Sequence, residues 1–259
     1  MKILVCVKQV LDMDDELTVR GDGRWVAEDN DSDRHLNYYD TFALEEAVRI
    51  KENLAEVTIE AISLGPDRVE LTLRQALALG ADQAIHLRTE TDELLNAGTV
   101  AALLAAVAKS RGYDLILTGV MSEDMMQRLT GPMLAAGCGL PCAASVVATR
   151  LDSTAGTVQA ECELEGGLRE SVRLTLPALL TIQSGINRPR YASLSNRLRA
   201  KSQEIEQVAA TELPAPTRVG QRLRRVYLPE KTATGLFLEG TSREKAETLL
   251  NLLHEKSIL

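Results

Sequence analysis

The chain has 259 residues, of which 45% are hydrophobic and 25% are charged, and its formal net charge is −8. This composition is typical of a folded globular protein and argues against intrinsic disorder. The acidic balance disfavours non-specific binding to nucleic acid, which requires a basic surface.

The first apolar run, Ile3 to Val7, has the length of a buried parallel strand. It is closed by Lys8 and is too short for a secretory signal. No later stretch reaches the roughly 20 apolar residues of a membrane span, so we expect a cytoplasmic protein. In the acidic stretch that follows, Gly21-Asp22-Gly23 lies between two short apolar pieces, which predicts a small surface hairpin.

An amphipathic helix is predicted over residues 41–54, with Asp40 as its N-cap. The apolar face of this helix is expected to pack against the strands. The opposite face is expected in solvent and carries Glu45, Glu46, Arg49 and Glu52.

Strands and helices then alternate along the chain. The predicted strands cover residues 57–64, 84–87 and 114–118. The predicted helices are residues 67–79, opened by a capping box at Asp67 to Glu70 and closed by Gly80, then 97–110 and 125–136. Such alternation indicates βαβ units, hence a parallel sheet with helices on both faces.

The pattern changes after Pro141, where strand-like segments follow one another with short turns between them. They cover residues 143–151, 158–164, 168–176 and 179–183 and predict an antiparallel extension of the same sheet. We therefore expect a three-layer α/β/α domain over residues 1–183. A polar connector over 184–206 and a C-terminal arm over 207–259, ending in a helix at about 242–255, complete the chain.

The cysteines and histidines are scattered in the sequence. Cys6, Cys138, Cys142 and Cys162 have no nearby histidine, whereas a zinc site requires clustered ligands. We expect no metal site, and cysteines that are reduced and buried.

Ligands of open parallel sheets bind beyond the carboxyl ends of the strands. Among the loops at those ends, the one after Thr118 has the most features of a ligand site. Gly119 permits a sharp turn, and the following helix offers free N–H groups to a phosphate. Thr130 adds a hydroxyl and Gly131 permits close backbone approach; alternatively, both glycines serve only turning and packing.

Motifs of the common nucleotide enzymes and hydrolases are missing. The sequence has no GxGxxG fingerprint, no Walker lysine, no GxSxG elbow and no HExxH zinc motif. A standard dehydrogenase, a P-loop hydrolase and a zinc protease are therefore disfavoured.

A second candidate site lies after the last predicted sheet strand, over residues 187–196. Pro189 stiffens it, and Tyr191 and Leu194 are expected to be exposed next to basic residues. An apolar side chain flanked by arginines suits the docking of an acidic partner. The alternative is a solvated connector.

Several segments resemble the small (β) subunit of electron transfer flavoproteins, over nearly the whole chain. The most specific are Leu176-Pro177-Ala178-Leu179-Leu180-Thr181 and Pro189-Arg190-Tyr191-Ala192-Ser193-Leu194. Others are residues 4–10, 35–40, 43–49, 63–66 and 73–82.

This resemblance implies a three-layer nucleotide-binding fold and a larger α subunit that holds the redox-active FAD with this chain. It also implies a structural AMP and an electron carrier without catalytic residues of its own. The carrier would take electrons from dehydrogenases and pass them to an acceptor or a respiratory chain. The implied docking residues for those dehydrogenases are Arg190, Tyr191 and Leu194. The implied AMP contacts are Cys6, Asn37, Tyr38, Tyr39, Asp40, Leu64, Gly119, Val120, Met121, Ser122, Asp124, Gln127, Leu129, Thr130 and Gly131.

The chain departs from the family pattern in the nucleotide loop, where only Asp124, Thr130 and Gly131 fit. Met13 replaces an aromatic residue that often approaches the flavin, and Asn37 is followed by Tyr38 instead of proline. The long C-terminal arm resembles that of electron-bifurcating members, in which a second FAD replaces AMP. That bifurcating subunit is the alternative function; a stand-alone nucleotide-binding enzyme or a nucleotide sensor is a more remote one.

Overall fold

The computed structural model describes residues 1–12, 18–26, 34–90, 95–214, 223–229 and 235–258. The chain divides into two units, Met1–Val226 and Tyr227–Leu259, which are described separately. Met13, to which the sequence analysis drew attention, lies outside the described residues.

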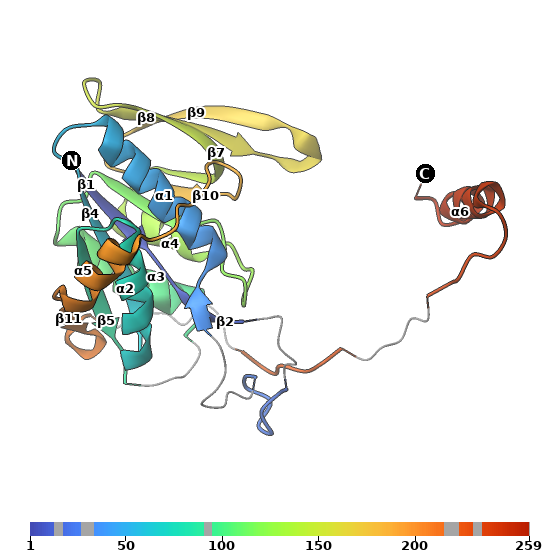
Figure 1. Ribbon diagram of the computed structural model, residues 1–259, viewed down its shortest axis with the longest axis horizontal. Helices are drawn as coiled ribbons and strands as arrows, with labels where there is room; N and C mark the ends of the chain where they lie inside the picture. Colours follow the sequence, from blue (N-terminus) through green and yellow to red (C-terminus); the bar gives the residue numbers. More distant parts are fainter. Residues whose placement is uncertain (13–17, 27–33, 91–94, 215–222, 230–234, 259) are drawn as a thin grey trace. The chain divides into compact units, whose positions relative to one another are not determined.

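Within the described residues, the first unit is built on a nine-stranded sheet with the order β11-β5-β4-β1-β6-β10-β7-β8-β9 (Figure 1). Neighbouring strands from β11 to β7 pair in parallel, whereas β8 and β9 pair antiparallel. The predicted α/β fold with an antiparallel extension is therefore confirmed. The strands are β1 (Lys2–Cys6), β4 (Thr58–Gly65), β5 (Gln83–Arg88), β6 (Leu115–Gly119), β7 (Cys142–Asp152), β8 (Thr157–Glu163), β9 (Arg169–Thr175), β10 (Ala178–Ile182) and β11 (Glu206–Ala209).

Helices cover both faces of the parallel part of this sheet. One face packs against α1 (Tyr38–Asn53) and α2 (Glu70–Leu79), and α5 (Leu194–Ser202) packs on α2. The other face packs against α3 (Ala97–Lys109) and α4 (Thr130–Cys138). The remaining elements are a separate pair, β2 (Gln9–Leu11) and β3 (Arg34–Leu36), and the 3-10 turns η1 (Asp67–Val69), η2 (Glu165–Gly167) and η3 (Ala210–Glu212).

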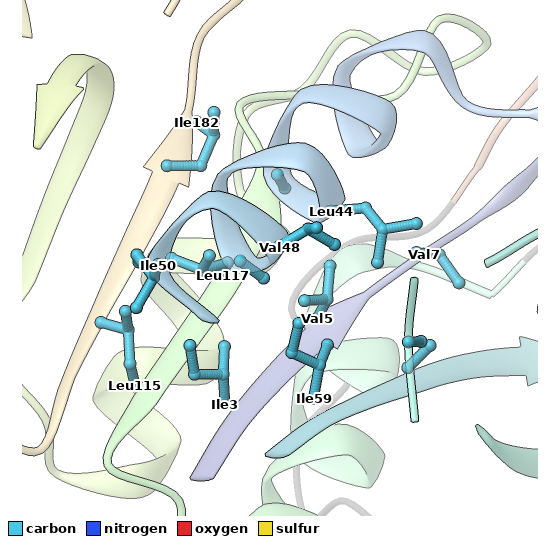
Figure 2. Packing of buried hydrophobic residues seen from close by; sticks show 14 of the residues in the cluster. Ile3, Val5, Val7, Leu44, Val48, Ile50, Ile59, Leu115, Leu117 and Ile182 are labelled. Atoms are coloured by element: carbon cyan, nitrogen blue, oxygen red, sulfur yellow. The ribbon is translucent and has the colours of Figure 1, made fainter. Parts of the chain in front are cut away.

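The central strand β1 shows why the sequence folds into three layers. Its side chains alternate between the two faces, so that Ile3 and Val5 contact the α1 side and Leu4 contacts the α3 side. Figure 2 shows Ile3 and Val5 packing beneath Leu44 and Val48 of α1. Each fully buried aliphatic side chain of this kind contributes roughly 1.5 to 3 kcal/mol of transfer free energy.

The N-terminal half of α1 differs from the prediction in two respects. Asn37 precedes the first turn, and Asp40 lies inside the helix instead of capping it, because its carboxylate binds the backbone N–H groups of Lys8, just after β1, and of Gly119 in β6. Glu45 and Glu46 were expected in solvent but are buried, because residues 187–190 cover them.

The predicted capping box at Asp67 to Glu70 is not formed. A 3-10 turn over Asp67–Val69 precedes α2, and no side chain of the described residues caps either helix. The two carboxylates bind arginines instead: Asp67 pairs with Arg88 at 2.8 Å and Glu70 pairs with Arg74 at 2.6 Å.

Residues 184–209 contain regular structure that the sequence analysis missed. Helix α5 packs on α2, and β11 adds a parallel strand beside β5 at the edge of the main sheet. The cysteines are free, as expected, but only Cys6 and Cys162 are buried; Cys142 is exposed.

The second unit contains α6 (Ser242–Glu255), with the predicted bounds. Its first turn has a true capping box, in which the N–H of Thr241 donates to Glu244 at 2.7 Å. In the described part of this unit no residue of α6 is buried, and Leu249 and Leu250 are each about half exposed. No helix among the described residues of either unit is long and apolar enough to cross a membrane.

Candidate functional site

A cavity of about 220 Å³ lies at the carboxyl ends of β1, β4 and β6. This is the position expected for a ligand of an open parallel sheet. The cavity walls come from the ends of these strands, from the start of α1 and from the loop between β6 and α4.

Most of the predicted nucleotide contacts line this cavity, although they come from distant parts of the sequence. They are Cys6, Asn37, Asp40, Leu64, Gly119, Val120, Met121, Ser122, Asp124, Gln127, Leu129, Thr130 and Gly131. Tyr38 and Tyr39 do not line it, and Tyr38 is half exposed at the start of α1. Lining residues that the sequence analysis missed include Lys8, Gln9, Trp25, Arg34 and Arg68. Lys8 and Gln9 lie two and three residues after the end of β1, and this position at the carboxyl end of a strand was the available signal for them.

Asp40 joins two walls of the cavity. Its two carboxylate oxygens accept hydrogen bonds from the backbone N–H groups of Lys8, at 2.8 Å, and Gly119, at 3.0 Å. Burial of the carboxyl group raises its pKa to about 7, against the lowering effect of these hydrogen bonds. Asp40 thus holds the ends of β1 and β6 to α1 from inside the protein.

Asn37 fixes the first part of the loop between β6 and α4. Its side-chain amide donates to the carbonyl of Met121 and its side-chain oxygen accepts from the N–H of Glu123, both at 3.0 Å. The carboxylate of Glu123 in turn accepts from the N–H of Tyr38 at 2.8 Å. The loop between β6 and α4 and the start of α1 therefore each supply a side chain that hydrogen-bonds to the backbone of the other.

Lys8 and Asp124 form an ion pair at the cavity wall. The Lys8 ammonium lies 2.6 Å from one Asp124 oxygen and 2.7 Å from the other. The Asp124 side chain is only 9% exposed, so this pair is shielded from solvent on the carboxylate side. It attaches the middle of the loop to the end of β1.

The second part of the loop presents backbone N–H groups without acceptors. Among the described residues, the N–H groups of residues 127–131 donate to no protein acceptor. Met126 and Arg128 have positive φ values of 49° and 55°, which are unusual for residues with side chains. Left-handed residues next to right-handed ones turn successive N–H groups to one side and create an anion-binding concavity.

Helix α4 begins at Thr130, five residues later than the predicted start at 125. Its N-cap, Leu129, has no side chain that can accept from the first turn. The positive end of the helix dipole therefore adds to the unpartnered N–H groups, and both favour a bound anion. We call the backbone of residues 127–131 the amide cradle.

The two glycines of this region serve packing. A Cβ atom on Gly131 would lie 2.5 Å from Cγ2 of Thr181 and 2.8 Å from Oγ1 of Thr118. A Cβ atom on Gly119 would collide with Asp40 and Tyr39. Both glycines thus allow close contact between protein elements, whereas their contact with a ligand stays a prediction.

The chemistry that these groups support is binding. Burial raises the pKa of the Cys6 thiol far above its ordinary value, so the thiol stays protonated and is a poor nucleophile. Asp40 is occupied by two backbone N–H groups, and Asp124 by Lys8. The donor set of the amide cradle fits a phosphate group, which has several acceptor oxygens.

The second candidate site lies between β10 and α5. Tyr191 is 95% exposed, and Leu194 is 74% exposed in the first turn of α5. Leu198, which the sequence analysis did not single out, is 58% exposed one turn later. We call Tyr191, Leu194 and Leu198 the docking surface. Arg190 is bound to α1 through Glu45 and Glu52.

Comparison with known proteins shows to which family the chain belongs. The family model described as the electron transfer flavoprotein domain matches residues 24–213. The electron transfer flavoprotein subunit beta of Methylophilus methylotrophus is 37% identical, over 98% of both chains. The subunit of the same name from Bacillus subtilis is 31% identical over 99% of both chains, and that of Bos taurus is 34% identical over 93% of this chain and 94% of its own.

Proposed function

The chain belongs to the electron transfer flavoprotein β-subunit family, and we propose that it carries electrons as one half of a heterodimer with an α subunit. In this proposal an FAD held with the α subunit accepts electrons from dehydrogenases and releases them to an acceptor or a respiratory chain. The β subunit supplies structure, a bound nucleotide and a surface for the dehydrogenases. It acts as a carrier and needs no catalytic residue of its own. A cytoplasmic location stays a prediction from the sequence.

The single observation that supports nucleotide binding in this proposal is the amide cradle. Five consecutive N–H groups at the start of a helix, for which the described part of the chain supplies no acceptor, match the needs of a phosphate. They line the same cavity as the apolar side chains of Leu64, Leu95 and Val100, which suit a flat base. We propose that AMP occupies this cavity with its phosphate on the cradle.

A second FAD in place of AMP is the other candidate, and the departure of the nucleotide loop from the family pattern favours it. In that loop only Asp124, Thr130 and Gly131 fit the pattern of the members that the chain resembles. Such a subunit would belong to an electron-bifurcating complex.

The experiment that tests the proposal measures what the purified heterodimer contains. The chain is expressed with its α subunit, the complex is denatured, and released FAD and AMP are quantified per heterodimer. One FAD and one AMP support the carrier, and two FAD without AMP support the bifurcating type. A complex without any flavin would contradict both candidate functions.

A further inference from the structure

Arg190 lies in the irregular segment between β10 and α5, and two glutamates hold it on α1. Its guanidinium donates to both oxygens of Glu45, at 2.8 and 2.9 Å, and to both oxygens of Glu52, at 2.7 and 3.1 Å. The backbone N–H of Arg190 also donates to Glu45, at 3.1 Å. These contacts use all but one of the N–H groups of the guanidinium.

The position and burial of the two glutamates suit this contact. They lie seven positions apart on α1, which places them on the same helix face two turns from each other. The Glu45 side chain is 8% exposed and would be a buried charge without Arg190. Hydrogen bonds from Arg190 lower the pKa of Glu52 below its ordinary value, so the Glu52 carboxylate is ionised at neutral pH. The guanidinium therefore has no free pair of N–H groups with which to bind the carboxylate of another protein.

The same segment is attached to α1 at a second point. The side-chain amide of Asn187 donates to the carbonyl of Phe42 and to the carboxylate of Glu46, each at 3.0 Å. Asn187 and Arg190 together bind the chain to α1 just before Tyr191, the first residue of the docking surface.

The far end of the docking surface is attached to α2. Arg74 of α2 donates to the carbonyls of Ala200 and Gln203, at 2.6 and 3.1 Å, where α5 ends. Arg199 of α5 donates in return to the carbonyl of Leu77, at 3.2 Å, near the end of α2. Each helix thus supplies an arginine to the C-terminus of the other, and α5 is held at both ends.

We propose that Arg190 is a positioning residue, which holds the docking surface ready for a partner dehydrogenase without contacting that partner itself. This inference rests on the proposed docking function. A preformed surface avoids the free-energy cost of ordering a loop when the partner binds. Loss of the contacts between Arg190 and α1 should therefore weaken the encounter with the dehydrogenase and leave the later electron transfer unchanged.

The test uses Glu52→Gln, because the two possible roles of Arg190 predict opposite results. Glu52 is 56% exposed, so the substitution should leave the fold intact. If Arg190 contacts an acidic partner directly, removal of the Glu52 charge frees the guanidinium and strengthens docking. If Arg190 acts through α1, the same change weakens docking. Glu204→Gln is the matched control, since Glu204 is exposed near the end of α5 and its substitution changes the net charge equally.

The measurement is steady-state reduction of the purified heterodimer by a dehydrogenase that reduces the wild-type complex. For Glu52→Gln and for Arg190→Gln we expect a KM for the heterodimer about threefold to tenfold higher, with unchanged kcat and unchanged FAD content. The double variant should be no worse than Arg190→Gln alone, because both changes remove one shared contact. Glu204→Gln should leave KM unchanged.

Other outcomes separate the inference from the proposed function. A lower or unchanged KM for Glu52→Gln, while Leu194→Ala raises it, would overturn the positioning role and leave the docking function standing. An equal rise for Glu52→Gln and Glu204→Gln would also overturn it, since net charge would then explain both. If Leu194→Ala and Glu52→Gln both leave KM unchanged, the docking function itself fails.

Discussion

The carboxylate of Asp40 accepts a hydrogen bond from the backbone N–H of Gly119 at 3.0 Å, across a separation of 79 residues. This bond ties the first turn of α1 to the end of β6, where the loop over the cavity begins. The other Asp40 oxygen binds the N–H of Lys8. A single buried side chain thus sets the distance between the walls of the proposed nucleotide site.

Asp40 should make the stability of the protein depend on pH. Burial raises its pKa from 3.8 to about 7, so the folded state binds this proton more tightly than the unfolded state. The stabilisation is therefore fully present below about pH 4 and is lost as the pH rises through about 7. We expect the unfolding free energy of the wild type in urea to fall between pH 5 and 8 by more than that of Asp40→Asn. Equal pH slopes for the two proteins would contradict this assignment.

Asn37→Ala should loosen the nucleotide loop. The substitution removes the bonds to Met121 and Glu123 and leaves two polar backbone groups without partners, which costs about 1 to 3 kcal/mol for each buried group. If AMP occupies the cavity, we expect the purified heterodimer to retain less AMP after gel filtration, with unchanged content of the FAD held with the α subunit. Asn53→Ala is the control, because Asn53 is exposed and its side-chain amide donates locally to the carbonyl of Arg49. Full nucleotide content in Asn37→Ala would show that the loop keeps its conformation without these two hydrogen bonds.

Gly131→Ala should destabilise the domain, because the added methyl group meets the buried Thr181 and Thr118 at 2.5 and 2.8 Å. Overpacking of this kind costs about 1 to 3 kcal/mol, more than the helix propensity gained by alanine. Chemical denaturation would measure the change. Gly21→Ala serves as the control, since a Cβ atom there meets nothing within 4 Å. If both variants unfold at the same denaturant concentration, the close contact at Gly131 is not needed.

Leu194→Ala should weaken electron exchange with a partner dehydrogenase. Leu194 is 74% exposed, so its truncation should cost little stability, yet burial of a leucine in an interface is worth roughly 1.5 kcal/mol or more. We expect the KM for the heterodimer to rise about tenfold at unchanged FAD content. Leu71→Ala is the matched control, because Leu71 is 67% exposed but lies on α2. Identical kinetics for the two variants would remove Leu194 from the docking role.

The sheet could be predicted from sequence because its strands are short apolar runs with clear boundaries. Strand β6, for example, was predicted at 114–118 and spans Leu115–Gly119. The start of α4 was placed five residues too early, because residues 125–129 have the composition of a helix. Their conformation is instead set by the tertiary contact between Lys8 and Asp124 and by left-handed residues that propensity does not reveal.

The docking segment was the other part that sequence alone could not resolve. Its exposed leucine and tyrosine were predicted, whereas the partners of Arg190 lie 145 and 138 residues away on α1. Without knowledge of those contacts, Glu45 was interpreted as part of a solvent-exposed helix face and Arg190 as a residue that docks the partner. Strand β11 was missed because its first two residues, Glu206 and Gln207, are polar and its remaining two are too few to form an apolar run.

The most direct test of this account is a crystal structure of the heterodimer, purified with the nucleotide that it retains. We predict a phosphate group within hydrogen-bond distance of several N–H groups of the amide cradle, residues 127–131, whether it belongs to AMP or to a second FAD. A nucleotide whose phosphate lies away from the cradle, with those N–H groups bound to water, would contradict the account.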